Sequence, residues 1–299
     1  MRRRVLILAC AVIAVGLAVF WWVTRPVGFD APEIAGITPD PARGEYVFRA
    51  AGCASCHIAP DAEAGALELV GGKAFASPFG TFYAPNISPH PDYGIGRWSA
   101  LDLVNALKAG VSPEGEHYYP ALPYASYAKM TTEDAVSLFA YLQTLPQVAA
   151  PSKPHEVPFP FSWRRLLGGW KFLFLDRDWA VASVPPGAET GRYLAEALTH
   201  CGECHTPRSG LGAMDKGRWL AGGPMPGGTR PLPNLTPGGL DWSEADLMTF
   251  LQTGFTPEFD VVGGDMALVS RNLATLPEAD LVSLVAYLKA VPAVAKLGE

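Results

Sequence analysis

The chain has 299 residues, of which 23 are Lys or Arg and 29 are Asp or Glu, so the formal net charge is −6. Hydrophobic residues make up 49% of the sequence, enough to bury a sizeable core. An acidic balance without a basic stripe argues against nucleic acid as a partner, and we expect none.

The N-terminus has a charged tip followed by a long apolar run. Three arginines at positions 2–4 precede an uncharged stretch over residues 5–23, which ends close to two tryptophans. At about 1.5 Å per residue this stretch matches the hydrocarbon thickness of a bilayer. A cleaved signal peptide is the alternative, but its apolar region would be shorter and would end in a small-x-small cleavage site. We therefore predict a transmembrane anchor over residues 1–25 and a linker over residues 26–39. The positive-inside rule places the remainder in the periplasm, anchored to the inner (cytoplasmic) membrane.

Two pentapeptides have the form C-x-x-C-H: CASCH at Cys53–His57 and CGECH at Cys201–His205. This is the attachment motif for c-type haem, in which both cysteines form thioether bonds and the histidine ligates the iron from one face. The predicted cofactors are two covalently bound haem c groups. The residues expected to hold them are Cys53, Cys56, His57, Cys201, Cys204 and His205, with His57 and His205 as iron ligands.

Other chemistries of the motif fit less well. The fifth cysteine, Cys10, lies in the apolar run, so no cysteine is left for a disulfide framework. A zinc site needs two further closely spaced ligands, and the remaining histidines offer none. A thioredoxin-like dithiol needs a βαβ context, whereas the flanking sequence is typical of helices.

The exported region is an internal duplication. Asn86-Ile87-Ser88-Pro89 matches Asn234-Leu235-Thr236-Pro237, Trp98-Ser99 matches Trp242-Ser243, and Ala140-Tyr141-Leu142 matches Ala286-Tyr287-Leu288. The period is far too long for a solenoid repeat. We predict a mostly α fold with two tandem class I cytochrome c-like domains and long haem-wrapping loops, preceded by one transmembrane helix. The expected bounds are 40–147 for the first domain, 148–186 for a Pro/aromatic-rich interdomain segment and 187–299 for the second domain.

The sequence pattern of each half predicts the same set of helices. A first helix, near residues 41–51 or 187–199, runs into the haem motif. A Gly/Pro-rich stretch follows, and then a helix capped by Ser99 or Ser243 that stops at Gly110 or Gly254. The last helix begins near residue 132 or 277. No convincing alternating pattern of a β-strand is present.

A low-spin haem needs a second axial ligand, and methionine raises its potential. For the second haem we favour Met266, placed in a loop before the last helix, over Met214, Met225 and the helical Met248. The equivalent position in the first half falls near Leu122, which cannot bind iron. Met130 is the candidate there, because it is the only methionine of that half. The alternatives are that Met130 packs in the core while His117, another residue or an open position faces the iron.

The repeated Asn and Trp residues have two interpretations. Asn86 and Asn234, with Trp98 and Trp242, are candidates to contact haem propionates or to shape the pockets. Equally, Asn-x-Ser/Thr-Pro is a turn and helix-entry device.

These residues resemble the diheme cytochrome c subunits of bacterial membrane-bound dehydrogenases. The specific parts are Asn86-Ile87-Ser88-Pro89, Gly94-Ile95-Gly96-Arg97-Trp98, the stretch from Tyr118 to Tyr124, and Met266 with Arg271-Asn272-Leu273. The resemblance implies electron transfer from a quinoprotein or molybdenum hydroxylase partner. This chain departs at Leu122, where quinoprotein-associated relatives often have methionine.

The interdomain segment has a proline-rich part and an aromatic part, Phe161 to Leu175. Proline gives a stiff linker. The aromatic part either packs between the domains or docks onto a partner or the membrane surface.

We therefore expect a non-enzymatic relay that passes single electrons from a periplasmic dehydrogenase to the respiratory chain, through a quinone, a soluble cytochrome or a terminal oxidase. Two alternatives remain. One is a haem enzyme that oxidises thiosulfate or reduces peroxide at the first haem. The other is a fixed cytochrome subunit of a larger respiratory complex.

Overall fold

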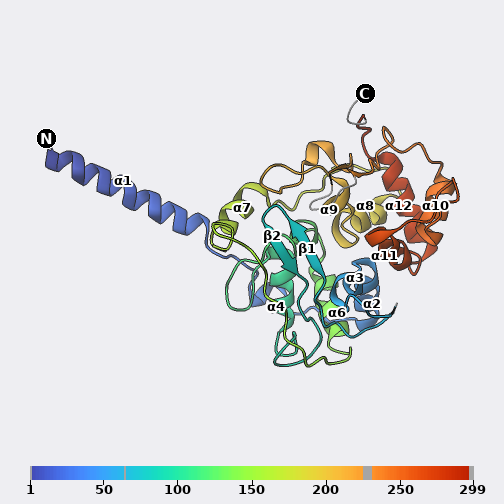
Figure 1. Cartoon of the computed structure of the whole chain (residues 1–299), viewed down its shortest axis with the longest axis horizontal. Coiled ribbons are helices and arrows are strands. Elements are labelled where there is room, and N and C mark those ends of the chain that lie inside the picture. Colours follow the sequence, from blue (N-terminus) through green and yellow to red (C-terminus); the bar gives the residue numbers. More distant parts are fainter. Residues whose placement is uncertain (1, 64, 225–230, 296–299) are drawn as a thin grey trace.

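The computed structural model describes residues 2–63, 65–224 and 231–295. The fold is mostly helical, with one long N-terminal helix, α1 (Arg2–Val23), projecting from a rounded body (Figure 1). Among the described residues this is the one helix long and apolar enough to cross a membrane, with a mean hydropathy of 2.6 and none of its residues buried.

The first half of the body contains helices in the predicted order. A 3-10 turn, η1 (Ala31–Glu33), comes first. It is followed by α2 (Pro41–Ala50), α3 (Cys53–His57), α4 (Ala100–Val104), the π-helix η2 (Asn105–Ala109), α5 (Tyr124–Tyr127) and α6 (Thr132–Leu142). Ser99 caps α4 by accepting from the Asp102 backbone N–H, and Gly110 ends η2 in the left-handed region. Both signals were predicted from the sequence and both are confirmed.

The second half repeats this order. Its elements are α8 (Glu189–Tyr193), the π-helix η3 (Leu194–Leu198), α9 (Cys201–His205), the 3-10 turn η4 (Lys216–Arg218), α10 (Glu244–Thr253), α11 (Gly264–Leu273) and α12 (Glu278–Ala290). Ser243 caps α10 and the left-handed Gly254 ends it, as predicted. Between the halves lies α7 (Leu166–Phe174).

Two features differ from the sequence prediction. Short antiparallel hairpins pair β1 (Ala74–Ser77) with β2 (Gly80–Tyr83), and β3 (Gly223–Pro224) with β4 (Pro231–Leu232). These strands are only four and two residues long, too short for a periodic pattern. Met266 also lies in a helix, α11, and not in the predicted loop.

A close helix crossing forms the centre of each half. α2 packs on α6, and α8 packs on α12. A Cβ atom on Gly44 would overlap the carbonyl oxygen of Ser137, and one on Gly191 would overlap that of Ser283. The Gly191 backbone N–H donates to Ser283 Oγ at 2.8 Å. The missing side chain therefore lets the two backbones touch.

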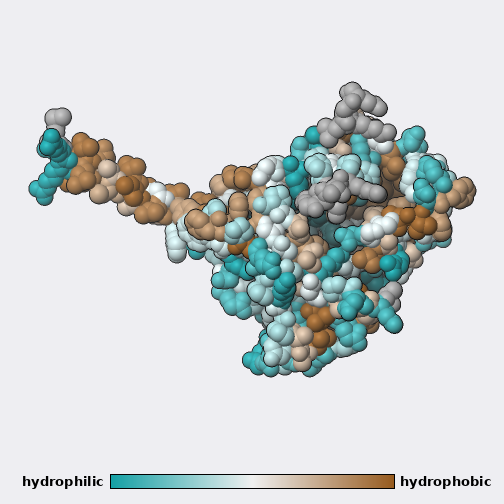
Figure 2. All heavy atoms as spheres, viewed as in Figure 1, coloured by the Kyte–Doolittle hydropathy of each residue, from teal (hydrophilic) through white to brown (hydrophobic). Residues whose placement is uncertain are grey.

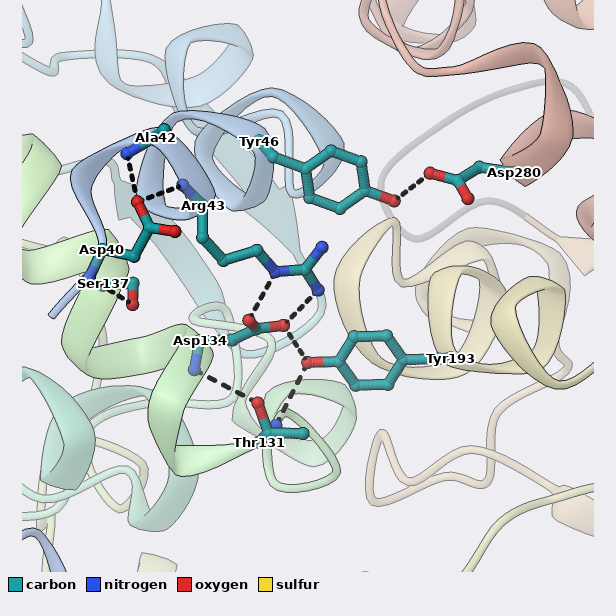
Figure 3. A network of polar contacts seen from close by, with 9 residues as sticks. All are labelled: Asp40, Ala42, Arg43, Tyr46, Thr131, Asp134, Ser137, Tyr193 and Asp280. Carbon is teal, nitrogen blue, oxygen red and sulfur yellow. Dashed lines mark hydrogen bonds and ion pairs between the residues drawn. The ribbon is translucent and has the colours of Figure 1, made fainter. Parts of the chain in front are cut away.

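The two halves share one hydrophobic core, and polar contacts cross between them (Figure 3). The Arg43 guanidinium donates to both carboxylate oxygens of Asp134 at 2.7 Å, and the Tyr193 hydroxyl donates to the same carboxylate at 2.6 Å. Tyr46 donates to Asp280 at 2.7 Å. Asp134 is almost fully buried, so these charge-assisted bonds offset its desolvation.

A buried carboxylate ties the interdomain segment to the second half. Glu196, on η3, is 0% exposed. It accepts from the backbone N–H groups of Ala180 at 2.5 Å and Val181 at 3.1 Å, and from the Tyr287 hydroxyl at 2.8 Å. Three donors satisfy the charge, so this part of the segment is fixed to the body.

The Gly191 crossing makes a stability prediction. Gly191→Ala should lower the free energy of unfolding of the haem-loaded protein by about 1–3 kcal/mol, because the methyl group overpacks the crossing. Gly169→Ala is the matched control, since its Cβ would meet only the Thr24 methyl group at ordinary contact distance. The better helix propensity of alanine should make that control neutral or slightly stabilising. Thermal denaturation followed by circular dichroism compares the two, and equal effects would contradict the close crossing.

Candidate haem-binding sites

The first motif forms its own short helix, α3, set at an angle to α2. Gly52 joins them with φ 62° and ψ 33°, in the left-handed region. His57 then faces the loop that follows the β1–β2 hairpin, and its Nδ1 lies 2.8 Å from the carbonyl oxygen of Pro85. Because a carbonyl only accepts, Nδ1 carries the hydrogen, and Nε2 is left with its lone pair as a ligand.

The second motif repeats this geometry. α9 follows His200, which is itself left-handed at φ 44°. Nδ1 of His205 lies 3.0 Å from the carbonyl oxygen of Pro233. In both halves the proline lies 28 residues after the histidine. The two sites therefore present equivalent imidazoles.

In each half one glycine brings the proline carbonyl into place. The Gly71 N–H donates to the His57 carbonyl at 2.6 Å, and the Gly222 N–H donates to the His205 carbonyl at 2.7 Å. Both glycines have positive φ angles, 80° and 73°. A Cβ on Gly71 would overlap the backbone of Pro85, and one on Gly222 would approach the backbone of Pro233. Glycine is therefore required for the loop to return to the histidine.

The protonation chemistry of the motifs suits covalent haem. Burial lowers the pKa of the His57 and His205 imidazoles, so both favour the neutral, ligating form. Burial raises the pKa of the Cys53 thiol to about 12 and that of Cys204 to about 11. Within the described ranges no group of three or more His, Cys, Asp or Glu side chains is arranged to hold a metal ion. The donor set fits haem c and not zinc.

The second half contacts the first motif helix directly. Asn272 on α11 donates to Ser55 Oγ, between the first pair of cysteines, at 2.9 Å. Lys73 donates to Asp265 on α11 at 2.7 Å and to the Ser55 carbonyl at 3.2 Å. The Asn272–Ser55 and Lys73–Asp265 pairs lie about 200 residues apart in sequence, and no local signal predicts them.

A second bridge approaches the other motif from α5. Ser126 donates to Glu203, between the second pair of cysteines, at 2.9 Å. The Tyr127 ring meets the His200 ring edge-on, with centroids 5.6 Å apart. Each motif helix is therefore contacted by the opposite half, which fixes the two haem attachment points relative to one another.

The candidate distal methionines have different settings. Met130 is 1% exposed and packs in the core, at the turn before α6. Met266 is partly buried on the first turn of α11. His117, an alternative for the first haem, uses Nε2 to donate to the Thr24 carbonyl at 2.9 Å, so that nitrogen is occupied. Met214 and Met248 pack beside the core, and Leu122 does the same. Met225 lies outside the described residues.

The paired Asn and Trp residues make mostly protein contacts. Asn86 Oδ1 accepts from the Ser88 N–H at 2.9 Å, and Asn234 Oδ1 accepts from the Thr236 N–H at 2.9 Å, each closing a turn. Asn86 Nδ2 donates to the Val148 carbonyl and Asn234 Nδ2 to the Val294 carbonyl, so each fastens the chain leaving its half. These are the contacts of the turn interpretation. Trp98 and Trp242 lie partly buried against the core, and haem contact by either pair stays a prediction.

Comparison with known proteins agrees with this geometry. The family model for cytochrome c matches residues 41–146. A diheme cytochrome c-type protein of Cereibacter sphaeroides is 51% identical over 98% of this chain and 99% of its own length. The fructose dehydrogenase cytochrome subunit of Gluconobacter japonicus and a nicotinate dehydrogenase subunit of Pseudomonas putida are each 38% identical over 87% of this chain. This chain spans only 54% of the first of these two relatives and 23% of the second.

Two C-x-x-C-H motifs whose histidines make equivalent hydrogen bonds are typical of a c-type cytochrome. The chain belongs to the family of diheme c-type cytochromes and carries two covalently bound haem c groups.

The proximal hydrogen bond makes a testable prediction. Gly222→Ala should push the Pro233 carbonyl away from His205 and weaken its hydrogen bond. A less basic imidazole stabilises the oxidised iron less, so the potential of the second haem should rise while that of the first is unchanged. Gly187→Ala is the matched control, because Gly187 also has a positive φ, 91°, but a Cβ placed there would have no neighbour within 4 Å. Spectroelectrochemical titration measures both potentials, and an equal shift in the control would assign the effect to backbone strain alone.

Proposed function

We propose that this protein is a membrane-anchored periplasmic cytochrome that relays single electrons from a dehydrogenase partner to the respiratory chain. The observation that carries the proposal is the pair of hydrogen bonds by which each half holds the motif helix of the other half, Asn272 to Ser55 and Ser126 to Glu203. A protein that passes electrons between two haems has to hold them at a fixed separation.

The proposal includes two tandem class I cytochrome c-like domains, residues 40–147 and 187–299, joined by residues 148–186. The equivalent crossings at Gly44 and Gly191 support it. So does the matched order of elements around each motif. In this arrangement each domain binds one haem, and the hydrogen bonds around each iron tune its potential.

Anchoring by α1 is supported by its contacts as well as its composition. Thr24, directly after the helix, is buried. Its carbonyl accepts from His117 at 2.9 Å, and its hydroxyl oxygen accepts from Arg165 Nε at 2.9 Å. Arg165 also donates to the Trp21 carbonyl at 2.5 Å. The end of α1 is therefore integrated into the body, as suits a retained anchor in the inner membrane.

A dehydrogenase partner is proposed from the relatives. Several are cytochrome subunits of fructose, alcohol (quinone) or gluconate dehydrogenases. Another is a subunit of nicotinate dehydrogenase. Both a quinoprotein and a molybdenum hydroxylase remain candidates, and Leu122 weighs against the quinoprotein class. The chain itself then acts as an electron-transfer subunit and not as the catalytic one.

Gentle detergent extraction from native membranes, followed by mass spectrometry of the co-purifying proteins, tests the relay. We expect a stoichiometric dehydrogenase, whose cofactor names the substrate class. Oxidase or cytochrome bc subunits would instead indicate a fixed component of a respiratory complex. If this protein were recovered without a partner and turned over thiosulfate or peroxide, the relay would be contradicted.

Methionine ligation at both haems is part of the proposal. Met266→Leu should lower the potential of the second haem and let the reduced protein bind carbon monoxide there, because the thioether ligand is lost. Met130→Leu should do the same at the first haem. Met248→Leu, in the middle of α10, is the matched control and should change neither. Optical redox titration with and without carbon monoxide checks all three. Carbon monoxide binding to the unsubstituted protein would indicate an open first haem and favour the enzyme alternative.

A further inference from the structure

Helix α7 exposes apolar side chains at the place where the anchor enters the body. Phe172 is 70% exposed and Leu173 is 65% exposed, and Trp163 just before the helix is 49% exposed. In Figure 2 the apolar surface of α1 continues onto this part of the body. Solvent-exposed apolar groups of this size mark an interaction surface.

The contacts of α7 place it beside the C-terminal end of α1. Gly168 packs so closely on Thr24 that a Cβ would overlap the Thr24 backbone. The Trp163 ring lies 5.8 Å from the Phe20 ring. α7 therefore lies level with the last turn of α1. If α1 crosses the bilayer with its arginine tip in the cytoplasm, this level is the periplasmic lipid–water interface.

The charges around α7 suit a lipid surface. Residues 166–175 contain no acidic side chain and one cation, Lys171. Lys171 turns inward and donates to the carbonyls of Ala109 and Gly110 at 2.7 and 2.6 Å, so the outer face is left uncharged. Arg25 and Arg165 lie over the rings of Trp22 and Trp21 at the edge of this face. Aromatic rings flanked by arginine are typical of the headgroup region.

We propose that α7 lies in the periplasmic lipid–water interface of the membrane. It is a second, monotopic membrane contact beside the anchor. Phe172, Leu173 and Trp163 enter the boundary between headgroups and acyl chains. This proposal rests on the proposed anchoring by α1. Two points of attachment hold the first half against the membrane and restrict its rotation about the anchor.

Spin labelling of the full, haem-loaded chain in lipid nanodiscs tests the proposal. Nitroxide labels are attached to Phe172→Cys or Leu173→Cys in a Cys10→Ser background, which removes the free thiol of the anchor. Power saturation compares collisions with oxygen, which concentrates in lipid, and with a water-soluble nickel reagent. Val282→Cys is the matched control, because Val282 is also an exposed apolar residue on a helix, at 53%. Leu17→Cys reports on the anchor.

The ratio of oxygen to nickel collisions should be several-fold higher at 172 and 173 than at 282, and should approach the ratio at 17. A water-like ratio at 172 with a lipid-like ratio at 17 would overturn the inference and leave the anchor standing. A water-like ratio at 17 would instead contradict the anchor itself. A label at 172 that is water-exposed in nanodiscs and becomes immobilised only in the co-purified complex would overturn the inference in favour of a protein partner.

Discussion

The hydrogen bond from the histidine of each C-x-x-C-H motif to a proline carbonyl is the constraint on which the geometry of each motif depends. It selects the tautomer in which Nε2 is available, and it holds the ring at a fixed angle. To make it, the chain has to return 28 residues later to the motif helix. The left-handed Gly71 and Gly222 make that return possible, and the Asn86 and Asn234 turns fasten the chain just beyond it. The connections from each histidine to its proline, with their short hairpins, are therefore shaped by this hydrogen bond.

The second level of organisation is the contact between the halves. Asp134 belongs to the first half, but it is held by Arg43 from its own half and by Tyr193 from the other. Removing either partner would leave a buried carboxylate with fewer donors, which is costly. Asn272 and Ser126 extend the same contact to the attachment helices. The two halves are consequently one packed unit, and contacts between side chains of both halves set their separation.

Local signals account for the part of this structure that could be predicted. Ser99 and Gly110 each act within one helical turn, so the ends of that helix follow from the sequence. The π-helix η3 has a subtler cause. Gly191 lies ten residues before Cys201, whereas Gly44 lies nine residues before Cys53, and a π-helical turn accommodates the extra residue. Helix α11 was missed because it begins at Gly264, directly after Gly263, and a Gly-Gly pair resembles a loop. The hydrogen bonds from each half to the motif helix of the other join residues 77 and 217 positions apart, and single-sequence patterns carry no information on such pairs.

The contacts of α1 distinguish the two halves, which the internal duplication alone does not. Thr24 is bonded by His117 of the first half and by Arg165 next to α7, and Lys171 of α7 caps the carbonyls at the end of η2. Each of these partners lies in the first half or the segment that follows it. The second half is tied instead through Glu196 to the later part of that segment. The first attachment motif is thus on the half that adjoins α1, and the second is on the half farther along the chain from it. Two nearly equivalent motif sites are therefore made inequivalent by where α1 and the residues that follow it pack on the body.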